Sequence, residues 1–290
     1  MSQVLDDLLS LLKLETIEQG IYRGQSQDLG FKALFGGQVM GQALSAAQET
    51  VEKDRQVHSL HSYFLRAGDA SKPVVYEVEV LRDGRSFSAR RIQAIQNGQA
   101  IFYMTASFQA PDQGFEHQDA MPDVPGPDEI SSYQDYIVEN QHVLTDKIRA
   151  KFLAEKPITL KPVEKYNWIE PEKMPAKCHM WIKANGDLPD DLRVHKYMLA
   201  YTSDFQFLPT ALFPHGVSHW RPDMQLATID HTMWFHRSFR FDDWLLYAID
   251  SPTATSGRGL VRGQIFNRQG ELVASTMQEG VMRFRKAPNT

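Results

Sequence analysis

Apolar residues near the start of the chain recur with the period of an α-helix. In MSQVLDDLLSLLKLETIEQG acidic residues lie between them, and the segment lacks the basic residues that open a signal peptide. A second helical pattern, GGQVMGQALSAAQET over residues 36–50, is rich in glycine and alanine. Side chains this small let a helix backbone approach its neighbours closely. We therefore expect an amphipathic helix at the start of the chain and a closely packed helix over 36–50.

Strand patterns follow the second helix. Apolar and polar residues alternate in a way that is typical of strands through 57–66, 74–84 and 87–109. The third segment contains Asn97-Gly98, a dipeptide that favours the tight turn of a β-hairpin. The pattern up to residue 110 thus predicts about four strands after the helix over 36–50.

The composition changes after residue 110. Prolines at positions 111, 122, 125 and 127 stand among glycine and aspartate, with little apolar content. This composition predicts a linker that crosses the surface. Residues 135–155 return to helical periodicity, and we interpret them as a helical spacer packed on the outside.

The second half of the chain repeats the order of the first. Acidic residues open its predicted helix, where they suit the positive end of the helix dipole. The strands are expected at 158–164, 177–186, 225–237, 244–253 and 257–284, and the helix at 189–205.

A faint internal similarity supports this repetition. A shift of 172 residues aligns Gly98 with Gly270 and Arg90 with Arg262, and a shift near 170 aligns His61 with His231. An internal duplication is the economical explanation. An antiparallel sheet with one apolar face needs a helix to cover it, which is the hot-dog arrangement. We predict an α+β fold of two tandem hot-dog units, at 1–112 and 157–290, joined by a linker and helical spacer at 113–156.

Composition and charge narrow the class of protein. With 42% hydrophobic and 23% charged residues the chain has the composition of a folded protein with a sizeable core. A formal net charge of -5 argues against a nucleic-acid partner, because such binding needs a basic surface. Cys178 is the only cysteine, so no intramolecular disulfide can form. No apolar run reaches the length of a membrane span. We expect a cytoplasmic protein without a membrane partner.

Several segments together resemble a known family. VHSLHSYFLRAG, RDGRSFSARRIQAIQNG, IFYMTASFQ, SDFQFLP, TIDHTMWFHR and ASTMQEG occur in the order and spacing of the type II acyl-CoA thioesterases, the TesB family of double-hot-dog hydrolases. The resemblance runs from about residue 3 to about residue 284. It implies hydrolysis of fatty acyl-CoA to free fatty acid and CoA. It also implies a catalytic group of Asp204, Thr228 and Gln278 that holds and activates one water.

These residue types suit the chemistry. Hydrolysis of a thioester needs a group that accepts a proton from water, and donors for the oxyanion. Asp204 can accept the proton, while Thr228 and Gln278 can orient the water. For the oxyanion we expect backbone N–H groups near the start of the first-half helix, at Gly36, Gly37 and Gln38.

The substrate also carries phosphates. Because CoA has a 3′-phosphate and a pyrophosphate, local positive charge is expected near its binding site. Two arginine-rich segments supply candidates for these contacts, with a solvated strand edge as the alternative role: Arg82, Arg85, Arg90, Arg91, Arg258 and Arg262. CoA is here part of the substrate and a product, so no cofactor is expected.

The segment LATIDHTMWFH places unusual polar residues in a predicted strand. If it is one regular strand, Thr228 and Asp230 share a face and His231 lies on the other. Asp230 would then be a neighbour of the catalytic group, and His231 a core histidine. A metal site is not expected, because His58 and His61 would point to opposite faces of one strand.

Two alternatives stay open at this point. A hot-dog acyl-CoA hydratase or dehydratase would need an Asp–His pair over the acyl β-carbon, for which Asp230, His61 and His231 are available. A non-catalytic acyl-CoA binding protein is the other. Strand edges left open by the fused pair further predict a homodimer or homotetramer.

Overall fold

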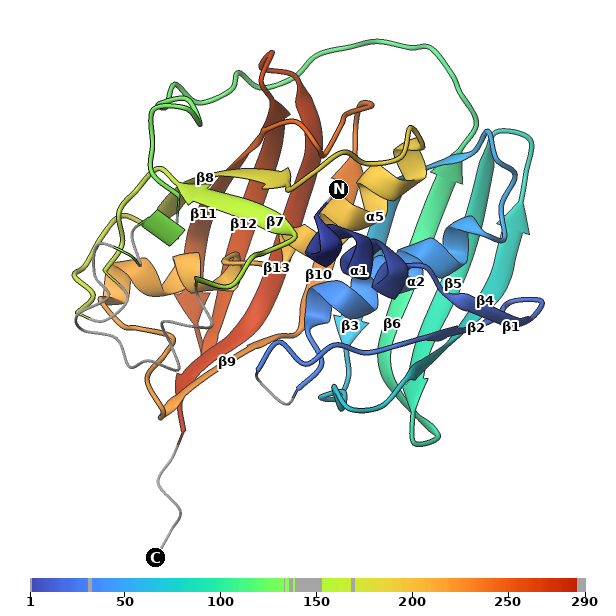
Figure 1. Ribbon diagram of the computed structural model, residues 1–290, viewed down its shortest axis with the longest axis horizontal. Helices are drawn as coiled ribbons and strands as arrows, with labels where there is room; N and C mark the ends of the chain where they lie inside the picture. Colours follow the sequence, from blue (N-terminus) through green and yellow to red (C-terminus); the bar gives the residue numbers. More distant parts are fainter. Residues whose placement is uncertain are drawn as a thin grey trace, which may run out of the picture.

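The computed structural model describes residues 2–30, 33–132, 134–135, 138, 153–167 and 170–285. Long antiparallel strands and the helices that they surround carry most of the architecture (Figure 1). The helical elements are α1 (Gln3–Leu12), α2 (Gly36–Gln48), α5 (Leu192–Ser203) and the 3₁₀ helix η2 (Leu208–His215). The strands are β1 (Glu15–Glu18), β2 (Ile21–Gly24), β3 (Gln56–Phe64), β4 (Val74–Asp83), β5 (Phe87–Gln96), β6 (Gln99–Gln109), β7 (Ile158–Pro162), β8 (Lys177–Ala184), β9 (Met224–Thr228), β10 (Asp230–Phe235), β11 (Leu245–Thr255), β12 (Arg258–Asn267) and β13 (Leu272–Phe284).

The strands form one continuous antiparallel sheet. Its order is β1-β2-β4-β5-β6-β3-β10-β13-β12-β11-β8-β7, with β9 paired to β13. The order is nearly symmetric about the pairing of β3 with β10, so that β6 and β13, then β5 and β12, then β4 and β11, take matching places on either side. The predicted α+β fold of two repeated helix-and-sheet units is therefore confirmed, and the two units share a single sheet.

The two main helices lie side by side against the inner face of this sheet (Figure 1). Every residue of α2 from Gly37 to Gln48 is buried. Its glycines permit this packing, because a Cβ on Gly37 would overlap the backbone oxygen of Tyr201, and one on Gly41 would lie 3.2 Å from the oxygen of Tyr197. The small residues of 36–50 thus set how closely α2 meets α5.

The ends of the helices agree with the sequence pattern. Helix α1 buries Leu5, Leu8 and Leu12, which is the apolar stripe of an amphipathic helix. Helix α5 begins after Asp191, whose side chain accepts a hydrogen bond from the Arg193 N–H at 3.0 Å, as its acidic opening predicted. The hairpin at Asn97-Gly98 is also present, with positive φ at both residues.

Two residue pairs that the predicted repeat aligns do not take equivalent places in the two units. Arg90 is 1% exposed on the inner side of β5, whereas Arg262 is exposed and pairs with Asp250. His61 is exposed, whereas His231 is fully buried. The units repeat in topology, but a shift by a fixed number of residues does not preserve which face a side chain takes. The turn after β5 has two residues, 97–98, whereas the turn after β12 has three, 268–270.

The segment between the units follows its prediction in part. Residues 110–126 contain no regular element, and the strand patterns on either side are separated by them. The helical spacer expected over 135–155 falls mostly outside the described residues. Within the part of the chain that the structure describes, no helix is both long and apolar enough to cross a membrane.

Candidate functional site

Asp204 lies where the two main helices meet. It follows the last residue of α5, and its Oδ2 accepts a hydrogen bond from the Gly37 N–H at 3.0 Å, in the first turn of α2. The residue before α2, Phe35, offers no capping side chain, so the carboxylate of Asp204 caps this helix from the other unit. A Cβ on Gly36 would lie 2.7 Å from Oδ2, which explains the glycine at that position.

Thr228 and Gln278 complete a hydrogen-bonded group with Asp204. The Thr228 hydroxyl donates to Asp204 Oδ1 at 3.3 Å, and Gln278 Nε2 donates to the same hydroxyl oxygen at 2.9 Å. Thr228 ends β9, while Gln278 lies in β13, the strand that pairs with it. The structure therefore brings the three residues expected from the family resemblance together at one place.

The predicted single strand over 225–237 is wrong. It divides into β9 and β10 at Ile229, because Thr228 lies opposite Gly280 and Thr232 opposite Met277. The chain advances four residues from Thr228 to Thr232, while its partner β13 advances only three from Gly280 to Met277. The segment therefore contains a β-bulge with one extra residue. The bulge puts Thr228 on the same side as His231. Asp230 instead turns its Oδ1 to the backbone N–H of Glu279, at 2.8 Å.

His231 is connected to the site through Gln278. Its Nδ1 lies 2.6 Å from Gln278 Oε1, and its Nε2 lies 3.1 Å from the hydroxyl of Ser203, the residue before Asp204. The side chain is 0% exposed and the ring of Phe207 packs against it edge-on. The prediction of a core histidine is confirmed, but sequence reasoning missed the connection of His231 to the site, because the alternation it used ignored the bulge.

Burial affects both charged groups of the site. Desolvation raises the pKa of Asp204, against the opposing influence of the nearby His231 and of its hydrogen-bond donors. Desolvation likewise lowers the pKa of His231 below the ordinary range of histidine, against the attraction of Asp204. The site therefore holds a carboxylate that is more basic than usual beside an imidazole that is less basic than usual.

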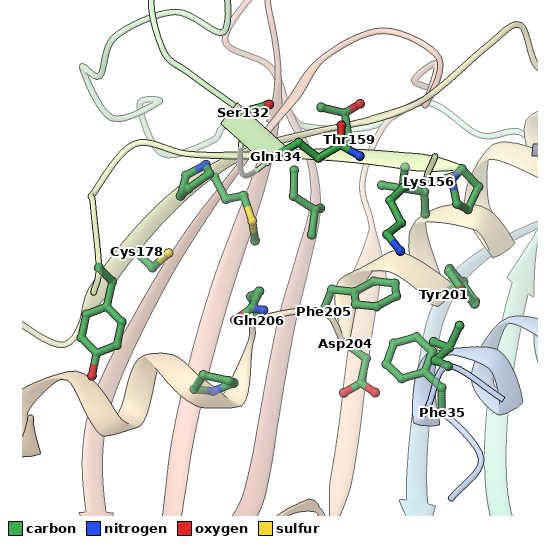
Figure 2. A pocket seen from close by; sticks show the side chains of 18 of the residues that line it. Phe35, Ser132, Gln134, Lys156, Thr159, Cys178, Tyr201, Asp204, Phe205 and Gln206 are labelled. Carbon is green, nitrogen blue, oxygen red and sulfur yellow. The ribbon is translucent and has the colours of Figure 1, made fainter. Parts of the chain in front are cut away.

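A cavity of about 780 Å³ opens beside these residues. Figure 2 shows Asp204 at its floor, next to Phe205 and Phe35, with Cys178 on the far wall and Lys156 above. Phe35 stacks on Phe205 with ring centroids 4.4 Å apart. Much of the remaining wall is apolar or aromatic, and includes Ile158, Leu160, Met180, Tyr201, Leu208, Phe213 and Leu226. The cavity joins a polar catalytic group to a mainly apolar space.

The expected oxyanion donors lie close to the carboxylate. The Gly37 N–H already donates to Asp204, and the Gln38 N–H points back to the Phe35 oxygen at 3.1 Å. The Gln38 side chain is buried and bridges the Gln27 N–H and the Gln25 oxygen. Gly36 and Gly37 thus lie beside Asp204, although none of the three residues lines the cavity, and their role toward an oxyanion stays a prediction.

The six arginines expected to bind CoA differ in exposure, and one of them is buried. Among the described residues, none of the six lines the cavity. Arg90 is enclosed by protein, with its donors directed to Thr50, Ala89, Arg82 and Asp83. The others are exposed or partly exposed, and Arg91, Arg258 and Arg262 pair with Glu79, Glu279 and Asp250. Contact of Arg82, Arg85, Arg91, Arg258 and Arg262 with CoA stays a prediction.

The histidines considered for a metal site share a face, contrary to the sequence expectation. An extra residue between Val57 and Ser59 in β3 places the His58 ring 2.8 Å from the Ser107 hydroxyl, on the outer side that His61 also occupies. Over the residues that the structure describes, no group of three or more His, Cys, Asp or Glu is arranged to hold a metal ion.

The hydratase alternative lacks a suitable Asp–His pair. His61 is exposed on the outer face of the sheet, His231 does not line the cavity, and Asp230 caps a backbone N–H. Cys178 does line the cavity, but burial raises the pKa of its thiol to about 12, so it stays protonated and is a poor nucleophile.

Comparison with known proteins agrees with this geometry. A family model for acyl-CoA thioesterase matches residues 147–281, and one for the acyl-CoA thioesterase N-terminal domain matches residues 25–109. The chain is 46% identical over 284 residues to acyl-CoA thioesterase 2 of Haemophilus influenzae, covering 98% of this chain and 99% of the relative.

Solved structures give the same result. Acyl-CoA thioesterase II TesB2 from Mycobacterium marinum superposes with a TM-score of 0.79 at 41% identity, over 96% of this chain and 99% of that one. A hot-dog protein from Alicyclobacillus acidocaldarius matches the fold with a TM-score of 0.77 at 20% identity, over 97% of this chain and 98% of that one. With two repeated units, a carboxylate site between their helices and this similarity along the whole chain, the protein belongs to the acyl-CoA thioesterase II (TesB) family of thioester hydrolases.

Proposed function

We propose that this chain hydrolyses fatty acyl-CoA to free fatty acid and CoA by direct attack of a water held by Asp204, Thr228 and Gln278. The observation that carries the proposal is the hydrogen-bonded group these residues form beside the cavity. Asp204 is the only member that can take a proton from water, because an ionised carboxylate is purely an acceptor. Its raised pKa makes it a stronger base than an ordinary aspartate.

The reaction follows from these roles. The water oxygen forms a bond to the thioester carbonyl carbon while Asp204 takes one of its protons. Collapse of the tetrahedral intermediate breaks the carbon–sulfur bond, and the proton on Asp204 passes to the departing thiolate. The products are the carboxylic acid and the CoA thiol, and Asp204 is ionised again.

The developing oxyanion needs hydrogen-bond donors that are already in place. We propose that the first-turn N–H groups of α2, at Gly36, Gly37 and Gln38, serve here, since they carry the positive end of the helix dipole. Gly37 would be shared between the oxyanion and Asp204, to which it donates at 3.0 Å, and Gln38 between the oxyanion and the Phe35 oxygen, at 3.1 Å.

The apolar walls of the cavity support a fatty acyl chain as the group bound inside. The CoA portion would then extend from the thioester toward solvent. We further propose that the protein acts in the cytoplasm and self-associates as a homodimer or homotetramer. Support for self-association comes from the sheet, whose order ends at the unpaired edges of β1 and β7 among the described strands. Sedimentation velocity measures this directly, and a monomer at micromolar concentration would contradict it.

Product analysis in labelled water tests the reaction. Enzyme in molar excess over a fatty acyl-CoA in H₂¹⁸O should release one thiol and one free acid per substrate, with one solvent oxygen in the acid after the first turnover. The Asp204 peptide should carry no label. Label in that peptide would mean that Asp204 attacks the acyl group itself. An intact thioester with water added to the acyl chain would indicate a hydratase.

A further inference from the structure

We propose that His231 is a positioning residue that sets the direction of the hydrogen bonds running through Gln278 and Thr228 to Asp204. The inference rests on the proposed function, since it assumes that these three residues hold the water. His231 does not line the cavity, so it touches neither water nor substrate and acts only through Gln278.

The direction of each hydrogen bond follows from a count of protons. Ionised Asp204 can only accept, so the single proton of the Thr228 hydroxyl points to its Oδ1. The Thr228 oxygen must then accept, and Gln278 has to present its NH₂ group to it. The carbonyl end of Gln278 consequently faces His231, and the Nδ1 at 2.6 Å has to carry a proton.

If Nδ1 carried no proton, its lone pair would face the Gln278 carbonyl oxygen at 2.6 Å, and the amide could satisfy His231 only by rotating. A rotated amide would turn its carbonyl oxygen to Thr228, whose proton is already donated to Asp204, and two acceptors would face each other. A donor at Nδ1 is what satisfies both ends of the Gln278 amide in one orientation, with the NH₂ toward Thr228 and the oxygen toward His231. His231 therefore keeps the Gln278 NH₂ toward the water site.

The surroundings of the ring suit this role. Ser203 Oγ lies 3.1 Å from Nε2 and 2.9 Å from the Ala200 oxygen, to which it can donate. Its single proton serves one of these two acceptors, and a neutral ring with its proton on Nδ1 requires that it point to Nε2. The titratable groups facing the ring are Asp204 at the end of α5, Asp230 on the same strand, and Tyr247 on β11, whose hydroxyl donates to the Ser203 oxygen. Burial lowers the pKa of His231, and the Phe207 ring excludes water from this side.

Two substitutions of His231 distinguish the role of Nδ1 from that of Nε2. Asparagine places its amide near the position of Nδ1, whereas glutamine places its amide near the position of Nε2. We expect His231→Gln to lower kcat by about tenfold or more while KM for acyl-CoA stays within about twofold, since one buried hydrogen bond is lost and substrate contacts are kept. His231→Asn should retain kcat within about threefold, because a donor to Gln278 remains. His236→Gln is the matched control, as His236 is exposed and its ring bonds only Ser275, at 2.9 Å, among the contacts described.

Equal kcat values for the asparagine and glutamine variants, whether high or low, would overturn the inference. Since either variant can fail to fold, the ring of the unmodified protein is tested as well, by ¹⁵N NMR of histidine-labelled enzyme. A proton on Nδ1 of His231 supports the proposal, and a ring protonated only at Nε2 overturns it. If the unmodified enzyme released no thiol at all, the proposed function would fail, and the NMR result would still decide the direction of the hydrogen bonds.

Discussion

At the scale of single residues, the site depends on contacts between the two halves of the chain. Asp204 comes from the second half, and the N–H that holds its Oδ2 comes from Gly37 in the first. Burial raises the pKa of the same carboxylate. Burial makes the carboxylate a stronger base, while the Gly37 N–H at the start of α2 opposes this by favouring the ionised form.

This raised pKa predicts the pH dependence of the reaction. Asp204 must be ionised to accept a proton from water, so kcat/KM should fall as the pH is lowered through its pKa. Because burial raises that pKa, the fall should be centred above the ordinary value for aspartate of about 3.9. Loss of thioester absorbance across a pH series measures it. An acid limb at or below the ordinary aspartate value would contradict the prediction.

Gly37→Ala tests the close approach of the two helices. The added Cβ would overlap the backbone oxygen of Tyr201, so α2 has to move away from α5 and from Asp204. We expect a fall in Tm of several degrees, since overpacking costs about 1–3 kcal/mol. Thiol release should also fall. Gly114→Ala is the control, because no atom lies within 4 Å of the added Cβ. Equal Tm values for the two variants would argue against the close approach.

Some residues of the site can be recognised from the sequence alone, and others cannot. Asp204, Thr228 and Gln278 stand in short segments that resemble a family, so the sequence alone is enough to name them as candidates. The role of His231 could not be inferred in this way, because an alternating strand pattern places it on the face opposite Thr228. One extra residue between β9 and β10 reverses the faces, and neither its presence nor its place is marked by glycine or proline.

At the scale of elements, helices and strands could be predicted because their patterns are local. The amphipathic helix at the start, the helix over 36–50 and the hairpin at Asn97-Gly98 each follow from period and turn chemistry. Side-chain partners across the sheet could not, since they depend on register. Arg90 illustrates this: it was expected at a phosphate, and it lies buried between the end of α2 and the hairpin of β4 and β5.

Arg90→Met therefore should affect stability rather than substrate binding. The guanidinium donates to the Thr50 hydroxyl and oxygen and to the Arg82 oxygen, and these acceptors would lose a buried partner. Hydrogen bonds to charged groups are worth about 1.5–3 kcal/mol each, so Tm should fall by several degrees. KM for acyl-CoA should stay unchanged. Arg91→Met, at an exposed position paired with Glu79, is the control and should keep its Tm. A raised KM without a change in Tm would restore Arg90 as a CoA contact.

At the scale of the whole molecule, the two units form one structure. Strand β3 pairs with β10, so that the sheet continues from one unit into the other, and α2 packs on α5 beneath it (Figure 1). Either unit alone would expose a sheet edge and an apolar helix face. The repeat in the sequence predicted two units but not their shared sheet, because the pairing of β3 with β10 leaves no local pattern.

Division of the chain tests this dependence. A break at Gly114, in the exposed segment that has no regular structure, cuts no sheet pairing. Residues 1–114 and 115–290 made separately should be insoluble or inactive, because the second piece lacks Gly37 and the first lacks Asp204. The two pieces made together should assemble and release thiol from acyl-CoA. Activity of the second piece alone would contradict a site built from both units.

The proposed mechanism depends most heavily on Asp204 as the base that activates water. The most direct test compares thiol release by the unmodified enzyme, Asp204→Asn and Asp223→Asn, and measures acyl-CoA binding to Asp204→Asn by calorimetry. Asp204→Asn should lower kcat by about a hundredfold or more and still bind the substrate, because only proton transfer is lost. Asp223→Asn, which removes an exposed partner of Arg221, should keep full activity. Turnover by Asp204→Asn at a rate near that of the unmodified enzyme would contradict the mechanism.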